Sequence, residues 1–429
     1  MKNYQLIFTF LTIFFSKMAF AGVGIADGAA IEYGFGSFGL IFIIIVVSII
    51  LLIELIILII LGFKKKKRTI LKMFKINAIV LPLLCLIIII IPKINEDFSG
   101  DYIIHNQEQL EEFGSNNLTK IRGHLLISGV SDLSPLNKLE EVSGNLLISF
   151  KEWDIYKKNE DLKSLEGLNN LKSIGGKLTI KYTSLTNLSG LYNLNTVKEG
   201  IKIENNSNLI TLKGLQNIAS SFNNINISYN PNLQSLEGLE NIKNIESLYL
   251  FKNQSLLSLK GLDNLTRVNS YFLIDSNNQL STLNSLKNLI SINNNYFRIN
   301  GTNLSSITGL NNLKNIGGNL EITNNQELTT LTGLESLKTI GDGLIIGNNN
   351  LLSSLNGLDN LDSISGSLQI GYYKPQHKSS KEYDRGNKIL SDYCAIKNTK
   401  ILGETFIKYN LINPNIKELN LSDNCKKNE

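Results

Sequence analysis

The sequence predicts a mainly β fold, a right-handed β-helical solenoid of about ten coils, preceded by an α-helical transmembrane hairpin. Two observations lead to this prediction. Leu- and Ile-rich segments recur in steps of 23 or 24 residues through much of the chain, and two long apolar runs flank a short basic segment near the N-terminus. The averages over 429 residues, 43% hydrophobic and 18% charged, conceal this division.

The net charge of +5 comes from one short segment of the chain. Residues 64–75 carry +7, whereas residues 1–63 and residues 76–429 each sum to −1. The large C-terminal part therefore offers no excess positive charge for phosphates, which argues against a nucleic-acid partner. The count of only 3 Cys argues against a disulfide-rich scaffold.

The first 21 residues have the pattern of a secretory signal. Lys2 precedes an apolar stretch over 6–15, and the small residues Ala19 and Ala21 mark a cleavage position. Two interpretations stay open, a signal peptide that is cleaved and a first transmembrane helix that is not. Residues 22–37 are expected to follow as a short extracytoplasmic segment.

The two apolar runs predict transmembrane helices over 38–63 and 76–92. At about 1.5 Å per residue, the first spans a hydrocarbon core of about 30 Å and the second reaches most of the way across it. The basic segment 64–75 between them is expected in the cytoplasm by the positive-inside rule. We therefore expect a multi-pass membrane protein with everything after the hairpin on the extracytoplasmic side.

Glu54 lies near the middle of the first predicted span, where a carboxylate costs about 3 kcal/mol. It is either a proton, ion or partner contact within the bilayer, or a side chain satisfied by packing against the second span. Neither span holds a second ionisable residue, which argues against a transporter. The basic segment determines topology, and contact with anionic lipid head groups is its alternative role.

The repeated unit is built around the motif L-x-G-L, which recurs in nine copies in register between residues 165 and 358, with Ser285 in place of Gly in one copy and Ile307 in place of the first Leu in another. An earlier copy at Leu133 is displaced by an insertion over 151–160. Each unit also holds a triplet whose outer two residues are apolar, the pattern of a short strand with those two side chains facing inward. The predicted strands lie at 146–148, 178–180, 201–203, 225–227, 248–250, 272–274, 297–299, 320–322, 344–346 and 368–370.

An Asn stands three residues after the end of most triplets. We expect these amides to stack and to satisfy buried backbone groups at the corner. Lys151, Thr183 and Thr302 stand at the same place in other coils, where we expect an interrupted ladder and looser packing. The ladder residues are Asn206, Asn230, Asn253, Asn277, Asn325 and Asn349.

The solenoid is predicted over 129–373, between two caps. Residues 93–128, with the helix-like stretch QEQLEEF, form a linker and N-terminal cap, and residues 374–429 form a loop and C-terminal cap. Cys394 and Cys425 lie in this second cap and are expected to pair if their Cα atoms lie within about 7 Å.

The pattern LTTLTGLESLKTIGDGLIIGNNNLLSSLNGL resembles the leucine-rich repeats of the receptor L-domain superfamily, which includes modules of the insulin-receptor and epidermal-growth-factor-receptor ectodomains. It is most similar to the bacterial cell-surface branch, over residues 101–425. The resemblance implies a scaffold that binds proteins or other surface ligands and shares no catalytic residues. The sequence departs from the receptors in lacking their Cys-rich modules and their kinase, and in its N-terminal anchor.

The outward face of the predicted sheet holds the candidate ligand-binding residues Tyr249, Phe251, Asp275 and Arg298. Adjacent coils bring them together, and aromatic and Arg side chains are favoured contact anchors. The alternative is that a face of ten strands carries such residues by chance.

We expect no enzyme activity, cofactor or metal site. The outward carboxylates Glu204, Asp275 and Glu321 are at least two coils apart, and the His residues lack metal-ligand spacing. The predicted function is therefore a membrane-anchored recognition or adhesion module that binds a protein or glycan. The alternative is a membrane sensor that relays ligand binding through its hairpin to a cytoplasmic partner. Neither the ligand nor the oligomeric state follows from the sequence.

Overall fold

The computed structural model describes residues 97–98, 100–149, 162–218, 221–371, 386–415 and 418. Residues 1–91 and residues 92–429 form separate units, and all the described residues belong to the second. The predicted signal peptide, both predicted spans, Glu54 and the basic segment thus lie outside the described residues. In the part of the chain that is described, no helix is both long and apolar enough to cross a membrane.

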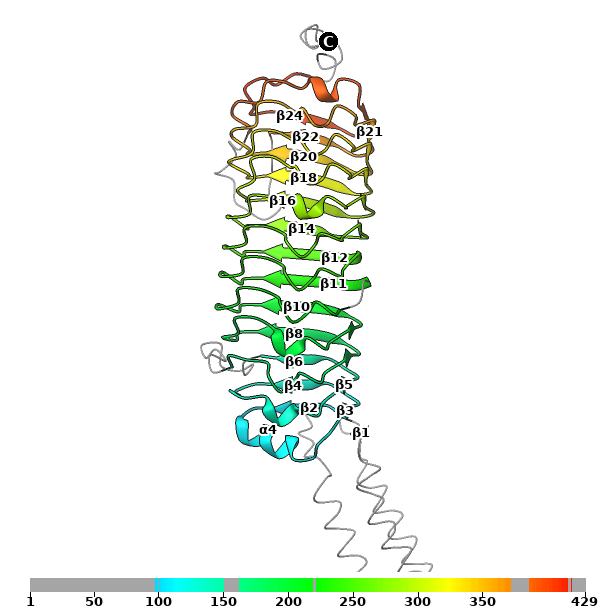
Figure 1. Ribbon diagram of the computed structural model, residues 1–429. Helices are drawn as coiled ribbons and strands as arrows, with labels where there is room; N and C mark the ends of the chain where they lie inside the picture. The colour runs from blue at the N-terminus through cyan, green and yellow to red at the C-terminus, as the bar shows by residue number, and fades with distance from the viewer. Residues whose placement is uncertain are drawn as a thin grey trace, which may run out of the picture. The chain divides into compact units, whose positions relative to one another are not determined.

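The described residues form a parallel β-solenoid, in which each coil adds one strand to a large sheet, here called the main sheet (Figure 1). Neighbouring strands are parallel and in register, so Leu248 lies beside Phe272 and Phe272 beside Phe297. Each of the ten predicted triplets lies in one of these strands, and β2, β4 and β24 extend the sheet at its ends. In order, the main sheet contains β2 (Tyr102–Ile104), β4 (Leu125–Ile127), β6 (Leu146–Ile148), β8 (Lys177–Lys181), β10 (Gly200–Glu204), β11 (Ser221–Ser228), β12 (Asn244–Phe251), β14 (Phe272–Asp275), β16 (Tyr296–Asn300), β18 (Asn319–Thr323), β20 (Leu344–Gly347), β22 (Leu368–Ile370) and β24 (Thr405–Ile407).

A second set of short parallel strands stacks along an adjacent side of the coils. The long strand β12 joins the later members, from β13 onward, to the main sheet, because Ile245 pairs with Val268 of β13 while Tyr249 pairs with Leu273 of β14. The earlier members, β1 to β9, form a separate five-stranded sheet. The two-residue strands are β1 (Asp97–Phe98), β3 (Lys120–Ile121), β5 (Glu141–Val142), β7 (Ser173–Ile174), β9 (Thr196–Val197), β13 (Arg267–Val268), β15 (Ser291–Ile292), β17 (Asn315–Ile316), β19 (Thr339–Ile340), β21 (Ser363–Ile364) and β23 (Lys400–Ile401).

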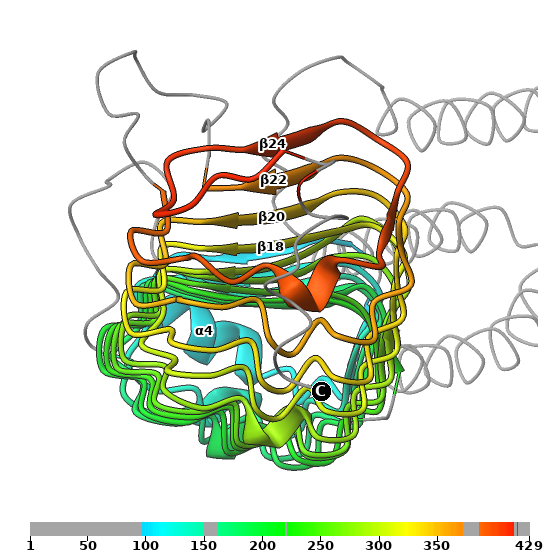
Figure 2. The same cartoon turned by 90° about the horizontal axis from the view of Figure 1, so that it is seen from above.

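One hydrophobic core runs through the interior of the solenoid. Figure 2, viewed along the stack, shows each coil as a loop around this interior. Leu328, Leu331, Leu334 and Leu337 are at most 1% exposed, because each bend of the coil turns the next apolar side chain inward. A single coil cannot enclose these side chains, so its stability depends on the coils stacked above and below it.

The turn at L-x-G-L takes two forms, and, except where Pro135 provides no N–H in the third position, they correlate with the residue two positions later. Glu240 accepts a hydrogen bond from the Gly238 N–H at 2.9 Å, and Gly238 has a φ of +119°. Lys287 offers no such acceptor, and its coil forms a 3-10 turn in which Ser285 replaces the Gly. The 3-10 turns are η1 (Ser134–Leu136), η2 (Ser189–Leu191), η3 (Asn284–Leu286) and η4 (Cys394–Ile396).

The Asn residues that follow the main-sheet strands are joined by buried hydrogen bonds. The Asn253 side chain accepts from the Asn230 N–H at 3.1 Å and donates to the Ile227 carbonyl at 2.9 Å. The same arrangement continues beyond residues 372–385 through Asn387 and Asn410. The repeat spacing alone does not reveal these last two, because the intervening segment displaces them along the sequence.

Thr183 and Thr302 each begin a run of this Asn ladder. Their Oγ1 atoms donate at 2.7 Å to the Oδ1 atom of the Asn in the next coil, and both side chains are buried. Among the described residues, no hydrogen bond joins Asn277 to Thr302. The ladder therefore has two runs, from Thr183 to Asn277 and from Thr302 to Asn410, while Lys151 lies outside the described residues.

A second column of Asn side chains links the outside of the turns. In the motif G-L-x-N-L, Asn264 donates to the Glu240 carbonyl one coil earlier at 2.8 Å. Ser336 replaces Asn at this place in one coil, where the amide donor is missing. The same bond is made by Asn193, Asn217, Asn241, Asn288, Asn312 and Asn360.

A helix replaces the turn in the first coil. The predicted helical stretch QEQLEEF forms α4 (Gln107–Gly114), and the Asn106 side chain caps it by accepting from the Gln109 N–H at 2.9 Å. Leu110 and Phe113 are buried against the core. The helix thereby covers apolar residues of the first coil that would otherwise meet water.

Candidate ligand-binding site

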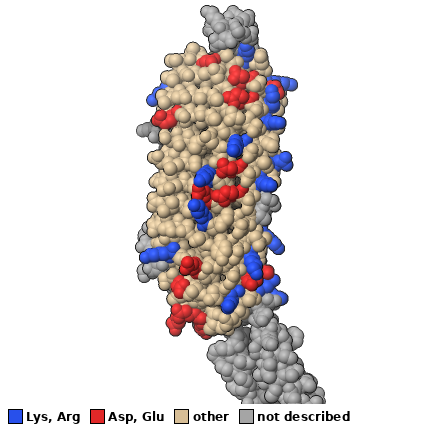
Figure 3. All heavy atoms as spheres, in the orientation of Figure 1, with Lys and Arg blue, Asp and Glu red and all other residues tan. Residues whose placement is uncertain are grey.

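The four candidate residues lie on the outer face of the main sheet, on neighbouring strands. Tyr249 and Phe251 belong to β12, Asp275 to β14 and Arg298 to β16, and all four are partly exposed. Strand pairing puts Phe251 directly beside Asp275, whereas Leu273 separates Tyr249 from Arg298. Figure 3 shows a largely uncharged surface in which acidic and basic side chains gather in small groups.

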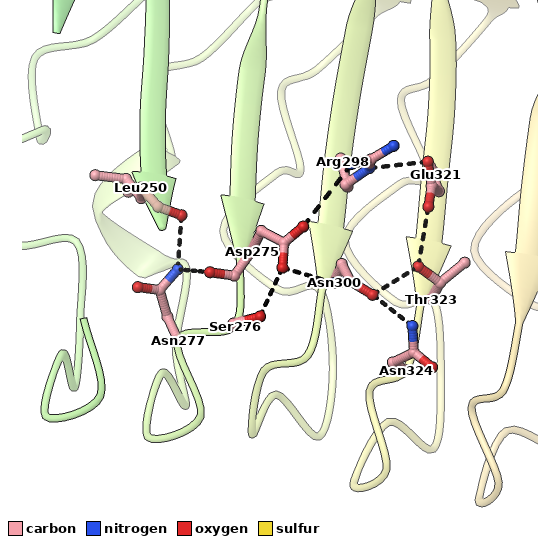
Figure 4. Close-up of polar contacts among 9 residues, drawn as sticks. All are labelled: Leu250, Asp275, Ser276, Asn277, Arg298, Asn300, Glu321, Thr323 and Asn324. Atoms are coloured by element: carbon pink, nitrogen blue, oxygen red, sulfur yellow. Dashed lines mark hydrogen bonds and ion pairs between the residues drawn. The ribbon is translucent and has the colours of Figure 1, made fainter. Parts of the chain in front are cut away.

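Arg298 links two carboxylates across three strands (Figure 4). Its Nε donates to Glu321 at 2.9 Å, and one terminal nitrogen lies 3.8 Å from the Asp275 carboxylate. Asp275 also accepts from Ser276 Oγ at 2.7 Å and from Asn300 Nδ2 at 2.8 Å. These contacts restrain the orientation of Arg298, since its guanidinium is hydrogen-bonded to one carboxylate and ion-paired with a second on the other side.

Glu321 points outward from β18 and is nevertheless only 2% exposed. Its two oxygens accept hydrogen bonds from Arg298 and Thr323, which compensates the carboxylate for the loss of water. Asp275 and Glu321 lie on strands separated by β16, so each carboxylate faces the guanidinium and not the other carboxylate. This arrangement holds a surface in place and does not form a pair of carboxylates for proton transfer.

The aromatic candidates belong to two ring pairs. Tyr249 stacks on Tyr271, with 6.1 Å between centroids and 28° between planes. Phe251 meets Tyr229 edge to face at 5.2 Å, and the Lys252 ammonium lies 5.0 Å from the Phe251 centroid and 5.2 Å from that of Tyr229. Lys252 thus makes cation–π contacts with both rings of the second pair.

Tyr229, Tyr271, Tyr296 and Lys252 belong to this surface, although the sequence analysis did not select them. Tyr271 and Tyr296 stand directly before the apolar triplets of adjacent coils. The predicted outward residues were the middle residue of each triplet and the residue after it, so this earlier outward position was missed. That shared repeat position, in YFLI and YFRI, is the signal that could have identified them. Tyr229 and Lys252 stand at the corner after the strand, in the left-handed backbone region.

Tyr296 connects the aromatic and the charged groups. The Arg298 guanidinium lies 5.7 Å from its ring centroid. Burial raises the pKa of the Tyr296 hydroxyl, and the nearby Glu321 carboxylate raises it further, whereas Arg298 acts in the opposite direction. The phenol therefore stays protonated at neutral pH and can donate a hydrogen bond.

The other predicted positions fall elsewhere. Cys394 is disulfide-bonded, whereas Cys425 lies outside the described residues, so their pairing stays a prediction. In the described part of the chain, no group of three or more His, Cys, Asp or Glu residues could hold a metal ion. A cavity of about 450 Å³ lies at the opposite end from α4, beside Thr405 and Phe406 of β24 and away from β12–β16.

Comparison with known proteins gives no assignment. No protein-family model matches the sequence, and no curated protein matches it. The function must therefore be argued from the site and from the sequence pattern.

Proposed function

We propose that this chain is a membrane-anchored recognition or adhesion module that binds a protein or glycan outside the cytoplasm. The observation that carries the proposal is the group of aromatic and ion-paired side chains on β12, β14 and β16. These strands are paired on both sides, so the side chains stand on an ordered backbone before any ligand arrives. Preordered aromatic and Arg side chains make favourable anchors, because binding costs them little entropy.

The proposed location rests on the sequence and on one cysteine. The apolar segments 38–63 and 76–92, with the basic segment between them, are typical of a hairpin that holds the following residues outside. The disulfide of Cys394 is consistent with an oxidising compartment. The likeness of the repeat to receptor L-domains supports a binding scaffold in preference to an enzyme.

Protease added to intact cells tests the location. We expect cleavage within residues 97–429 without permeabilisation, detected by an antibody against this part of the chain. Protection that is lost only after permeabilisation would contradict the proposed orientation. A cytoplasmic marker protein, which must survive the same treatment, is the control for cell integrity.

A binding screen tests the role of the outer face. Full-length protein in nanodiscs is presented to cell-surface proteins and glycans, and the hits are measured again with a Tyr249→Ala, Phe251→Ala double variant. We expect a loss of affinity of about tenfold or more. Tyr192→Ala, which removes a more exposed ring from a turn, is the control. Unchanged binding of every hit by the double variant would contradict the proposal.

A further inference from the structure

The outer face of the main sheet carries a strip of tyrosines along the solenoid axis. Tyr249 lies on β12, Tyr271 directly precedes β14 and Tyr296 begins β16, so each stands one coil further along the stack than the one before. All three are partly exposed. The ring centroids of Tyr249 and Tyr271 lie 6.1 Å apart. Tyr271 and Tyr296 stand at the same position of adjacent coils, whose strands are about 4.8 Å apart, so the spacing along the strip is on the scale of one pyranose unit.

The rings of the strip are restrained by their neighbours. Tyr249 and Tyr271 support each other through their stacked contact at 6.1 Å. Tyr296 lies against Arg298, which Glu321 holds at 2.9 Å. Flat, restrained aromatic rings suit the C–H faces of sugar rings, because stacking there buries apolar area at little entropic cost.

Polar groups able to bond hydroxyls accompany the rings. No hydrogen bond engages the hydroxyls of Tyr249, Tyr271 and Tyr296 among the described residues. Asn226, beside Tyr249 on β11, accepts from Ser228 Oγ at 2.9 Å, which leaves its two amide hydrogens for a ligand. Phenol and amide groups both donate and accept, which matches the mixed donor and acceptor character of a sugar hydroxyl.

The charges around the strip are already engaged in contacts. Arg298 faces Glu321 and Asp275, and Lys252 lies over two aromatic rings. Asp342, which also acts on Tyr296, accepts a hydrogen bond from Asn319. Two cationic and three anionic side chains therefore sum to −1, and a charged ligand would have to disrupt these contacts. The charge distribution thus complements an uncharged ligand.

The backbone of these strands excludes the commonest mode of peptide binding. An extended peptide adds to a sheet at an open edge, whereas β12, β14 and β16 are interior strands with neighbours on both sides. Among the outward residues of β12, β14 and β16 that surround the strip, Leu273 is the single aliphatic side chain. An amphipathic helix therefore finds no apolar groove there.

We infer that the tyrosine strip binds an uncharged glycan chain, lying along the solenoid axis with successive pyranose rings on Tyr249, Tyr271 and Tyr296. The inference rests on the proposed function and names its ligand class. Hydroxyls of the sugar bond to the phenols and to the Asn226 amide, while the Arg298 network keeps Tyr296 in position.

Calorimetric titration of the full-length protein in nanodiscs tests the inference. The probes are cellohexaose, chitohexaose and mannohexaose as uncharged chains, with hexagalacturonate as the anionic comparison. We expect at least one uncharged chain to bind more tightly than hexagalacturonate. A Tyr249→Ala, Tyr271→Ala double variant is expected to weaken that binding by about tenfold or more.

Two controls separate stacking from an effect on folding. Tyr249→Phe keeps the ring and should retain affinity within about threefold, since one solvent-exposed hydroxyl is lost. Tyr192→Ala, with its ring 44% exposed on a turn, should leave binding unchanged.

The inference is overturned if no uncharged chain binds, if hexagalacturonate binds best, or if the double variant binds like the unaltered protein. A protein ligand whose binding is lost in the double variant would then still support the proposed function. If no uncharged chain binds, and no protein ligand depends on these aromatic residues, the two proposals are overturned together.

Discussion

The corner that holds the Asn ladder and the outer face of the main sheet follow opposite rules. The ladder repeats the same amide in coil after coil, whereas the outward positions of β12, β14 and β16 hold Tyr249, Leu273 and Arg298, no two alike. Every coil has the same buried backbone groups to satisfy at the corner, but its outer face meets only solvent. The fold is therefore encoded where the repeat holds, and the proposed recognition depends on the positions where it varies.

The largest loss of stability is expected from Asn253→Leu, which removes one amide from the ladder. The change keeps the size of the side chain but leaves the Asn230 backbone N–H without its acceptor and removes the bond to the Ile227 carbonyl, in a fully buried site. The Asn230 side-chain nitrogen keeps the Ile203 and Ser228 carbonyls as acceptors. We expect a loss of about 4 kcal/mol in the free energy of unfolding. Urea unfolding followed by circular dichroism measures it, and a loss below about 1 kcal/mol would show that the ladder is not structurally essential.

A Gly on the inside of the turn gives the next largest effect. At Gly214 the φ is +123°, and a Cβ atom would lie 1.8 Å from the Leu188 carbonyl oxygen. Gly214→Ala should cost about 3 kcal/mol. Ser285→Ala, at the same repeat position in a 3-10 turn, should cost less than about 0.5 kcal/mol. Equal losses in the two variants would refute the division of the turns into two forms.

An Asn side chain added to the outside of the turns should stabilise the protein. Ser336→Asn restores the amide missing from the second Asn column, and its nitrogen should donate to the Asn311 carbonyl as Asn264 does to that of Glu240. We expect a gain of about 0.5 kcal/mol, because the site is partly exposed. Thermal unfolding measures the gain, and Ser336→Ala serves as the comparison without a donor. A destabilised Asn variant would show that this column lacks the assigned geometry.

The smallest effect concerns an ion pair on the outside of the turns. Hydrogen bonds from Lys260 and then Lys213 lower the pKa of Glu237 below its ordinary value of 4.5. The carboxylate therefore stabilises the fold fully above that value, and the contribution is lost as the pH falls through the lower folded pKa. The stability difference between the native protein and Glu237→Gln should shrink over this range, by less than the effect at Ser336. A difference that does not change with pH would contradict this assignment.

Most of the fold could be predicted because its determinants are local and periodic. The triplets identified the strands and their register, since a period of two fixes which side chains enter the core. The coil that contains Asn387 escaped prediction because a segment of unequal length precedes it. The two turn forms could not be predicted from the L-x-G-L motif alone, because they correlate with residues that flank it, such as Glu240 and Lys287.

The candidate site could be predicted only in part, because its geometry depends on neighbours across strands. The position of Arg298 on the outer face follows from the pattern, but its contact with Glu321 requires the side-chain rotamers. The burial of Glu321 has no sequence signal, since the pattern marks it as outward. Tyr271 and Tyr296 could have been found by comparing the residue before each triplet in adjacent coils.

The Asn ladder has a consequence for the order in which the chain is synthesised. Within each run of the ladder, a coil gives its donors to the Oδ1 atom of the following coil, as Asn206 does to Asn230. A coil that has just left the ribosome thus waits for the next one before these groups are satisfied. At the last coil the acceptor comes from the same segment, because the Asn413 side chain accepts from the backbone and side-chain nitrogens of Asn410. A chain truncated just before Asn413 would therefore leave its final coil permanently without these partners.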